Sequence, residues 1–342
     1  MSHRRVFGTA ARRATVAAVV VMAVGLCAIL VSAARAAEKK AAKEATAAAT
    51  APEGKGKSPT KVGTTNASYT ETVGDAKMEM IWIPAGTFQM GGRMSPEDVV
   101  KKYGGAANDE KFFQDEHPVH EVELDGFWMG KFEVTNAQFR KFRTGHSSKE
   151  FEGRTLDGAD QPVVYVSWDE AKAFCDWLSQ KSGKTYTLPT EAQWEYACRA
   201  GTEAERYWGD DDARMGEYAN TSDRTLKGQL GAKLPLGWIY AETTDGYALT
   251  APVGRFKPNG FALHDMIGNV WEWCGDWYGE KYYGESPRRN PRGPAAGTYR
   301  VLRGGSWYYP PRHCLSAFRA YSTPDNRYDF FGFRVVRTQK SQ

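Results

Sequence analysis

The sequence predicts an α+β domain that is irregular and rich in loops, with short strands and short helices. Composition is the first observation: 35 glycines and 11 tryptophans among 342 residues suggest tight turns fixed by large buried rings. The second is the strict alternation of polar and apolar residues in Val119–Leu124, which is typical of a half-buried strand. The third is a set of helix-start signals without any long amphipathic helix after them.

Strands are predicted first near the start of the ordered sequence, at about Met78. Residues 80–83 and 87–91 indicate a strand, a turn and a second strand. A polar excursion over residues 92–114 separates them from the alternating strand at 119–124.

Three short helices are predicted from their capping signals. The pattern hydroxyl-x-x-Glu/Gln satisfies the first unpaired amides of a helix, and it occurs at Thr135 with Gln138, Ser167 with Glu170, and Thr190 with Gln193. Apolar residues then fall on one face of each segment. Residues 201–250 show no clear period, and so long an irregular stretch in a compact domain is usually functional or organised by an ion.

Residues 1–36 are interpreted as an export signal. They hold five arginines and no acid, then an apolar run and the small-x-small sequence Ala34–Ala36. Arg4–Phe7 resembles part of a twin-arginine signal, and an uncleaved membrane anchor is the alternative. We therefore expect a periplasmic or extracellular protein that meets a membrane only through an uncleaved leader.

The charge balance changes once the leader is removed. Subtracting its five arginines from 45 basic residues leaves 40 against 41 acidic residues, a net charge of −1. This balance gives no electrostatic basis for binding nucleic acid. Residues 37–75, rich in Ala, Lys and Thr, predict a disordered linker, and residues 76–338 form the predicted domain.

Six motifs occur together and in order along that domain. They are Ile83–Gly91, Glu133–Asn136, Pro162–Trp168, Leu188–Ala197, Gly268–Trp273 and Arg303–Trp307. In this combination the chain resembles the formylglycine-generating enzyme (sulfatase-modifying factor) family. The resemblance implies a single irregular domain related to C-type lectins.

The resemblance implies a catalytic loop, but its metal-binding pair is incomplete. The family's enzymes hold copper with two cysteines that follow the Gly-Gly-Ser motif, and a thiolate pair suits Cu(I). The matching positions are Tyr309 and Cys314, while Ser306 matches an active-site serine. We therefore do not expect the copper site, although Cys314, Ser306 and Tyr309 remain the candidate catalytic residues.

Histidines do not suggest an iron site either. His117 and His120 lie three apart, but on a strand that spacing places them on opposite faces, and Pro118 excludes a helix. His264 and His313 have no partner at a ligand spacing. Iron is therefore not expected.

Four cysteines follow the leader: Cys175, Cys198, Cys274 and Cys314. In an oxidising compartment they could form zero, one or two bridges. By the family's extracytoplasmic enzymes, the resemblance implies a disulfide between Cys198 and Cys314, which would leave Cys314 without a catalytic role.

Calcium is the cofactor that the resemblance implies. Carried over residue by residue, one set is Asn220, Thr221, Asp245 and Tyr247, and the other is Asp265, Gly268, Val270 and Glu272. Each set mixes side-chain oxygens with backbone carbonyls, a combination that calcium accepts. Bound calcium would explain how residues 201–250 keep a shape, whereas ordinary loop acids are the alternative.

Residues 308–331 suggest a ligand-binding surface. This segment contains no Lys, Glu, Gln, Met or Trp and resembles the variable region of retroelement-diversified lectin-fold proteins. Its aromatic residues would provide adaptable contacts. The predicted binding surface is Trp307, Tyr308, Tyr309, His313, Phe318, Tyr321, Tyr328 and Phe330.

Two functional classes remain open from sequence. In the first, the chain is an exported, oxidoreductase-like modifier of an extracytoplasmic peptide or protein that lacks the full copper pair. In the second, it is a non-catalytic, calcium-stabilised, lectin-like protein that binds such a ligand. The first requires a free Cys314 thiol, and the second requires exposed rings between residues 308 and 331.

Overall fold

The computed structural model describes residues 67–73, 76–105, 107–234, 238 and 240–338. The predicted leader and nearly all of the predicted linker lie outside these residues. The linker boundary at residue 75 is wrong in one respect, because Ser68–Val73 forms strand β1 and pairs with β2. The segment is a strand because β2 follows it directly and pairs with it. Its composition alone did not indicate this pairing.

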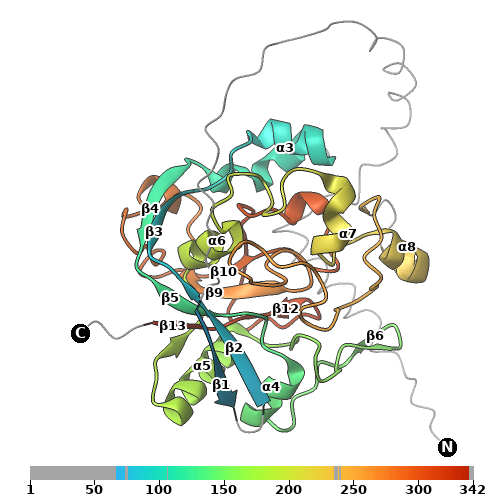
Figure 1. Ribbon diagram of the computed structural model, residues 1–342. Helices are drawn as coiled ribbons and strands as arrows, with labels where there is room; N and C mark the ends of the chain where they lie inside the picture. The colour runs from blue at the N-terminus through green and yellow to red at the C-terminus, as the bar shows by residue number, and fades with distance from the viewer. Residues whose placement is uncertain (1–66, 74–75, 106, 235–237, 239, 339–342) are drawn as a thin grey trace, which may run out of the picture. The chain divides into compact units, whose positions relative to one another are not determined.

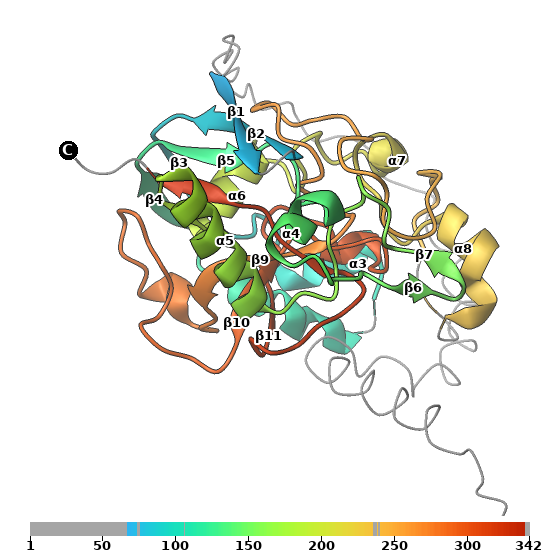
Figure 2. The ribbon, with the colours of Figure 1, turned by 90° about the horizontal axis from the view of Figure 1, so that it is seen from below.

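A five-stranded antiparallel sheet joins the two ends of the described chain (Figure 1). Its strands, in spatial order, are β1 (Ser68–Val73), β2 (Ala76–Ile83), β5 (Phe127–Gly130), β13 (Val336–Thr338) and β8 (Tyr186–Thr187). Helix α4 (Asn136–Phe142) contacts β2, and helix α5 (Trp168–Ser182) contacts β1 and β8 (Figure 2).

A four-stranded sheet carries the motifs Gly268–Trp273 and Arg303–Trp307. Its order is β11 (Ala320–Ser322), β10 (Arg300–Arg303), β9 (Trp271–Trp277) and β12 (Phe331–Gly332), with β12 parallel to β9. Two smaller sheets pair β3 (Gly86–Met90) with β4 (His120–Leu124) and β6 (Glu150–Phe151) with β7 (Arg154–Thr155). The strands predicted at 80–83, 87–91 and 119–124 are therefore confirmed.

The other helices are short. They are α3 (Pro96–Tyr103), η2 (Ala107–Phe112), η3 (Gln114–Glu116), α6 (Glu191–Arg199), η4 (Asp212–Arg214), α7 (Met215–Tyr218), α8 (Arg224–Leu230), η5 (Gly231–Lys233), η6 (Tyr282–Gly284) and η7 (Pro311–His313). Four of them lie in residues 201–250: η4, α7, α8 and η5. No period was evident there because three of the four, η4, α7 and η5, span a single turn each. In the part of the chain that the structure describes, none of the helices combines the length and apolarity needed to cross a membrane.

All three predicted capping boxes are present. Thr135, Ser167 and Thr190 each accept a hydrogen bond from the backbone amide three residues later. The side chains of Gln138, Glu170 and Gln193 return a bond to the capping residue's amide. These reciprocal bonds begin α4, α5 and α6 at the positions that the sequence indicates.

The core is dominated by aromatic rings. Trp194, Trp271, Trp273 and Trp307 are all fully buried. Because Glu272, between Trp271 and Trp273, is buried as well, both faces of β9 are covered.

Candidate functional site

The candidate loop, residues 306–314, lies between Arg303, the last residue of β10, and the segment 316–318. This fully buried guanidinium donates to the carbonyl oxygens of Ser316, Ala317 and Phe318 at 2.6–2.8 Å. It also pairs with Glu195 of α6 at 2.5 Å. Arg303 therefore fixes the distance between the start of the loop and the chain that leaves it.

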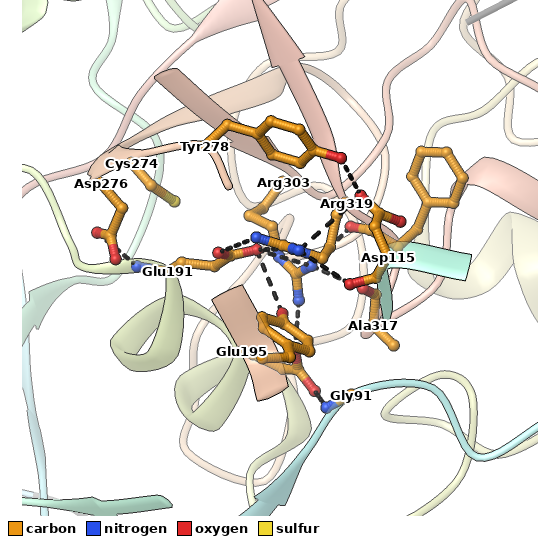
Figure 3. Close-up of polar contacts among 12 residues, drawn as sticks. Gly91, Asp115, Glu191, Glu195, Cys274, Asp276, Tyr278, Arg303, Ala317 and Arg319 are labelled. Atoms are coloured by element: carbon orange, nitrogen blue, oxygen red, sulfur yellow. Dashed lines mark hydrogen bonds and ion pairs between the residues drawn. The ribbon is translucent and has the colours of Figure 1, made fainter. Parts of the chain in front are cut away.

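A second arginine completes the buried ionic network beneath the loop. Arg319 forms two hydrogen bonds to Glu191, at 2.7 and 2.9 Å, and donates to the carbonyl oxygen of Asp115 (Figure 3). Burial opposes ionisation of Glu191, but Arg319 and Arg303 hold its pKa below the ordinary value. Such a network is costly to break, because removal of one partner leaves a buried charge.

Cys314, the remaining cysteine of the candidate catalytic loop, is sealed inside the protein. Its side chain is fully buried, and its thiol is directed to the carbonyl oxygen of Tyr309 at 3.8 Å. Burial raises the pKa of the Cys314 thiol to about 12. A thiol, not a thiolate, is therefore present at neutral pH, and the thiolate is the nucleophile.

Gly305 shows how closely the backbone approaches that thiol. Its φ is +79°, and a Cβ built on it would lie 2.4 Å from the Sγ of Cys314. Only glycine fits both the backbone conformation and the space. The Gly-Gly-Ser motif thus packs directly against the cysteine.

Tyr309 fills the position where the resemblance places the first copper-binding cysteine. Its ring meets Trp271 edge-on with centroids 5.2 Å apart and contacts Phe330 at 5.5 Å. Burial raises its pKa further above the ordinary value for tyrosine. Ser306 is fully buried and accepts the amide of Tyr309 at its carbonyl oxygen, at 3.0 Å. The loop is therefore a packed turn.

The prediction of an exposed aromatic surface is wrong for most of its residues. Trp307, Tyr309, His313, Phe318 and Phe330 are buried, whereas Tyr308, Tyr321 and Tyr328 are half-buried. The rings face one another instead of solvent. For example, Tyr308 and Tyr328 both stack on Phe330, with centroids 5.6 and 5.3 Å away. Sequence spacing could not distinguish a row of surface rings from a cluster that packs on itself.

His313 lies inside this cluster. Its two ring nitrogens are buried, and neither has a hydrogen-bond partner among the described residues. Burial, with the nearby charge of Arg312, lowers its pKa well below the ordinary value, so the imidazole is neutral.

The disulfide expected between Cys198 and Cys314 is not formed, and this expectation is corrected. Both residues are buried free cysteines. The thiol of Cys198 lies 3.7 Å from the hydroxyl of Ser316, while that of Cys314 is directed to Tyr309. The two sulfur atoms thus have different neighbours, although both residues belong to one core.

The first calcium set has a feature that favours a cation. The Oδ1 atom of Asn220 is buried and has no hydrogen-bond partner among the described residues. Asp245 accepts the amides of Thr221 and Tyr247, at 3.0 and 2.8 Å. Burial, together with the negative charge of Asp223, raises the pKa of Asp245 to about 8. Ca²⁺ would stabilise this arrangement. It could bind the amide oxygen of Asn220, which lacks a donor, and it would offset the negative charges of the two carboxyl groups.

The second set is more fully occupied by protein. Glu272 receives Arg334 through two hydrogen bonds of 2.7 Å and also the indole nitrogen of Trp194 at 2.9 Å. Asp265 keeps one buried oxygen without a hydrogen-bond partner among the described residues. Glu272 therefore already has a cationic partner in Arg334. Among the described residues, Asp265 is not hydrogen-bonded to that arginine.

Sequence analysis missed Glu133 at this second set. The residue is buried, and burial followed by the charges of Asp265 and Glu272 raises its pKa well above the ordinary value. It accepts the side-chain amide of Asn269 at 2.8 Å. Its position in the Glu133–Asn136 motif is the signal in the sequence that could have indicated it.

Asn269 connects both sets to the candidate loop. It adopts a left-handed conformation with φ of +57° and is fully buried. Its amide donates to the carbonyl oxygen of Asn220 at 2.8 Å, and its carbonyl oxygen accepts the amide of Trp307 at 2.9 Å. One residue therefore spans the calcium segment and the loop.

Groups of three or more His, Cys, Asp or Glu side chains that could hold a metal ion are absent from the described ranges. His120 lies on β4 and approaches the carbonyl oxygen of Pro118 through its Nδ1 at 3.1 Å. Both calcium sets would instead rely on mixed amide, carbonyl and carboxylate oxygens.

Two cavities are found in the described structure, and the loop lines the first of them. One, of about 660 Å³, is lined by Pro311 of the loop and by residues of α3, α7 and the 240–244 segment. The other, of about 620 Å³, is lined by residues 142–147 and by Lys149, Tyr165, Glu170 and Arg327. Tyr165 donates its amide to the carbonyl oxygen of Tyr328, so the second cavity adjoins the aromatic cluster.

Comparison with known proteins identifies the class to which this fold and loop belong. The family model described as "Sulfatase-modifying factor enzyme 1-like domain" matches residues 66–339. The chain therefore belongs to the sulfatase-modifying factor family, as its motifs predicted, and its α+β, loop-rich fold is that of the family.

Individual relatives agree with this assignment. The chain is 32% identical over 314 residues to the formylglycine-generating enzyme of Mus musculus, covering 76% of this chain and 75% of the mouse protein. Its structure is similar to that of PvdO from Pseudomonas aeruginosa, with a TM-score of 0.62, 27% identity and coverage of 83% and 100%. It is also similar to Treponema denticola variable protein 1, with a TM-score of 0.63, 26% identity and coverage of 80% and 99%.

Proposed function

We propose that this protein is an exported, calcium-stabilised member of the family that does not perform copper-dependent oxidation and binds an extracytoplasmic peptide or protein. Because most rings of residues 308–331 are buried, such a ligand would meet only the half-buried ones, Tyr308, Tyr321 and Tyr328. The observation that carries this proposal is the pair of residues at the copper-ligand positions. Tyr309 is a buried ring, and Cys314 is a buried thiol with a raised pKa. One thiol beneath a packed aromatic cluster does not supply the two thiolates that a linear Cu(I) site requires.

The calcium part of the proposal rests on the oxygen atoms of the 220–247 segment. Asn220 and Asp245 would hold the ion through their side chains, and Thr221 and Tyr247 through backbone carbonyls. Bound calcium would supply a positive charge that balances Asp245 and Asp223. The buried, unpaired Oδ1 of Asn220 supports this assignment.

Oxygen consumption tests the catalytic part. Purified full-length protein, loaded with Cu(I), is mixed with a cysteine-containing peptide while dissolved oxygen and peptide mass are followed. We expect neither oxygen uptake nor a change in peptide mass. Turnover that is lost in Cys314→Ser would overturn the proposal.

Oxidoreductase activity at Cys314 is the second candidate, and one observation favours it. Cys314 is a free cysteine and not a disulfide, as this function requires. The aromatic cluster would have to open before a substrate could reach the thiol. Reaction of native protein with a thiol reagent at the rate of a free cysteine, with Cys314 identified by mass spectrometry, would support this second candidate.

Export is tested separately. Cell fractionation of the full chain and of a variant lacking residues 2–36 should place the first outside the cytoplasm and keep the second inside.

The gene sequence tests diversification of residues 308–331. A near-copy of the codons for this segment beside a reverse-transcriptase gene would support diversification. The remaining surface available for diversified contacts is the half-buried and exposed part of residues 321–329.

A further inference from the structure

The cavity of about 620 Å³ beside Tyr165 has a positively charged lining. Arg143, Lys149 and Arg327 contribute cations, and Glu170 is the acid that lines it. Burial lowers the pKa of His146, a further lining residue, so that its imidazole adds no charge at neutral pH. The lining therefore holds three cations against one carboxylate.

Glu170 orders both arginines while leaving donors on each. One of its oxygens binds Arg143, and the other accepts the Nε of Arg327 at 2.8 Å. Both arginine side chains keep 47% of their surface exposed. A guanidinium has five N–H donors in a planar fork, so each arginine can bind a further acceptor from solvent.

Buried hydrogen bonds fix the position of residues 146–148 next to this cavity. The hydroxyl of Ser148 donates to the Oδ1 of Asn136 at 2.6 Å and accepts the amide of Val164 at 3.0 Å. His146 contacts the carbonyl oxygen of Val164 through its Nε2 at 3.0 Å. The loop that carries Arg143 and Lys149 is thus fixed from below, which reduces the entropy lost on binding.

Two residues of the lining have a strained backbone. Lys149 has a φ of +62° and Tyr165 a φ of +57°, in the left-handed region that side chains rarely adopt. The ammonium of Lys149 lies 4.2 Å from the centre of the Tyr165 ring. Such strain persists where the surrounding structure imposes it, and it is concentrated at binding sites.

Neighbouring acids limit the charge that the cavity can accept. Asp169 acts on Arg327, and Asp329 lies near Lys149. Burial raises the pKa of Asp329 to about 6, so it is largely ionised at neutral pH. A dianion such as phosphate would meet these acids and Glu170, whereas a singly charged carboxylate would meet less repulsion and still fit the planar arginine fork.

We infer that this cavity binds a carboxylate group of a peptide, either an acidic side chain or a free C-terminus. The site rests on the proposed peptide-binding function and specifies its ligand. The contact between Tyr165 and Tyr328 places the carboxylate beside the half-buried rings of residues 321–329, where the rest of a peptide can lie.

Titration calorimetry with three synthetic peptides tests the assignment on the full-length protein. The peptides are acetyl-Ala-Ala-Glu-Ala-Ala-amide, its Gln counterpart, and acetyl-pentaalanine with a free C-terminus. We expect at least one carboxylate peptide to bind about tenfold more tightly than the Gln peptide and to weaken in high salt. Preference for the Glu peptide identifies a side-chain carboxylate, and preference for the free acid identifies a C-terminus.

Variants locate the site. Arg143→Met and Arg327→Met should each reduce that affinity about tenfold. Lys257→Met is the matched control, because Lys257 is an exposed cation paired with Glu217 away from this cavity. Circular dichroism and the melting temperature establish that each variant is folded.

Equal binding of all three peptides would overturn the inference, as would arginine variants that behave like Lys257→Met. Displacement of the peptide by inorganic phosphate at a lower concentration than by acetate would overturn the assignment to a carboxylate. Binding is measured without turnover, so its failure is distinct from a failure of the oxygen-uptake prediction at Cys314.

Discussion

Two regions of this protein contain buried carboxyl groups, and the charges of these groups are balanced in different ways. Beneath the candidate loop, Glu191 and Glu195 are paired with Arg319 and Arg303 at 2.5–2.9 Å. In the 220–247 segment, Asp245 faces Asp223, the buried Oδ1 of Asn220 lacks a partner among the described residues, and the pKa of Asp245 is raised. The first region brings its own counter-charges, and the second has the composition of a site completed by a cation.

The first region is stabilised by the protein's own side chains, whereas we expect the stability of the second to depend on calcium and pH. In a network of paired arginines and carboxylates, each partner stabilises the ionised form of the other. Carboxyls that face one another must bind either a proton or a metal. Stability should therefore respond to mutation in the first region and to calcium and pH in the second.

Removal of Arg303 should have the largest effect. Arg303→Met leaves Glu195 with Arg199, 2.9 Å away, but without its closest cation, and removes the donor to three carbonyl oxygens. We expect a loss of more than about 3 kcal/mol in the free energy of unfolding, measured with urea. Arg289→Met, which removes an exposed pair with Asp125, should have a much smaller effect, because solvent screens exposed ion pairs. A loss below 1 kcal/mol for Arg303→Met would show that the network is not the scaffold of the loop.

Removal of calcium should have the next largest effect. A calcium concentration about 100-fold above the dissociation constant stabilises a one-site protein by about 2.7 kcal/mol. We expect a chelator to lower the melting temperature of the wild-type protein and to leave Asp245→Asn unchanged. An equal response of both proteins would place the ion elsewhere.

The calcium effect should grow with pH. The pKa of Asp245 is raised from 3.8 to about 8 in the folded protein, so without metal the native state holds a proton that the unfolded state releases. The stability that this proton provides is present at low pH and is lost as pH rises through about 8. Calcium replaces the proton, so its increment in melting temperature should be larger at pH 9 than at pH 6. A constant increment across this range would contradict the role of Asp245.

Asp276 provides the smallest expected effect, within the ionic region itself. Burial and the charge of Glu191 raise its pKa to about 8, so it is mostly protonated at pH 7. It accepts the amide of Glu191 at 3.0 Å, a bond that an asparagine can also make. Asp276→Asn should therefore change the free energy of unfolding by about 1 kcal/mol or less. A larger loss would show that this carboxyl is charged in the native protein.

Local signals in the sequence predicted much of the fold. The three capping boxes depend on residues three apart, and the strand at 120–124 depends on its own alternation. The start of β1 was missed because its partner β2, and not its own composition, makes it a strand. Family motifs located the loop at residues 306–314.

The candidate site was less predictable because its properties depend on burial. Tyr309 and Cys314 were placed in the loop by their spacing, but no local pattern showed that their side chains are sealed. The sequence of residues 308–330 is the same whether their rings face solvent or one another, so it does not show which of the two occurs. Glu133 approaches Asp265 and Glu272 only after more than a hundred residues of chain have folded between them.

Asn269 has a consequence for the order of folding. Its hydrogen bonds reach Glu133, Asn220, Ala251 and Trp307, which are 136, 49, 18 and 38 residues away along the chain. Contacts that close such long loops lose chain entropy before they gain binding energy, and they slow folding. The bonds of Asn269 should therefore form late, after the local helices and hairpins. Replacement of this asparagine should then act mainly on the rate of unfolding, because late contacts contribute little to the transition state for folding.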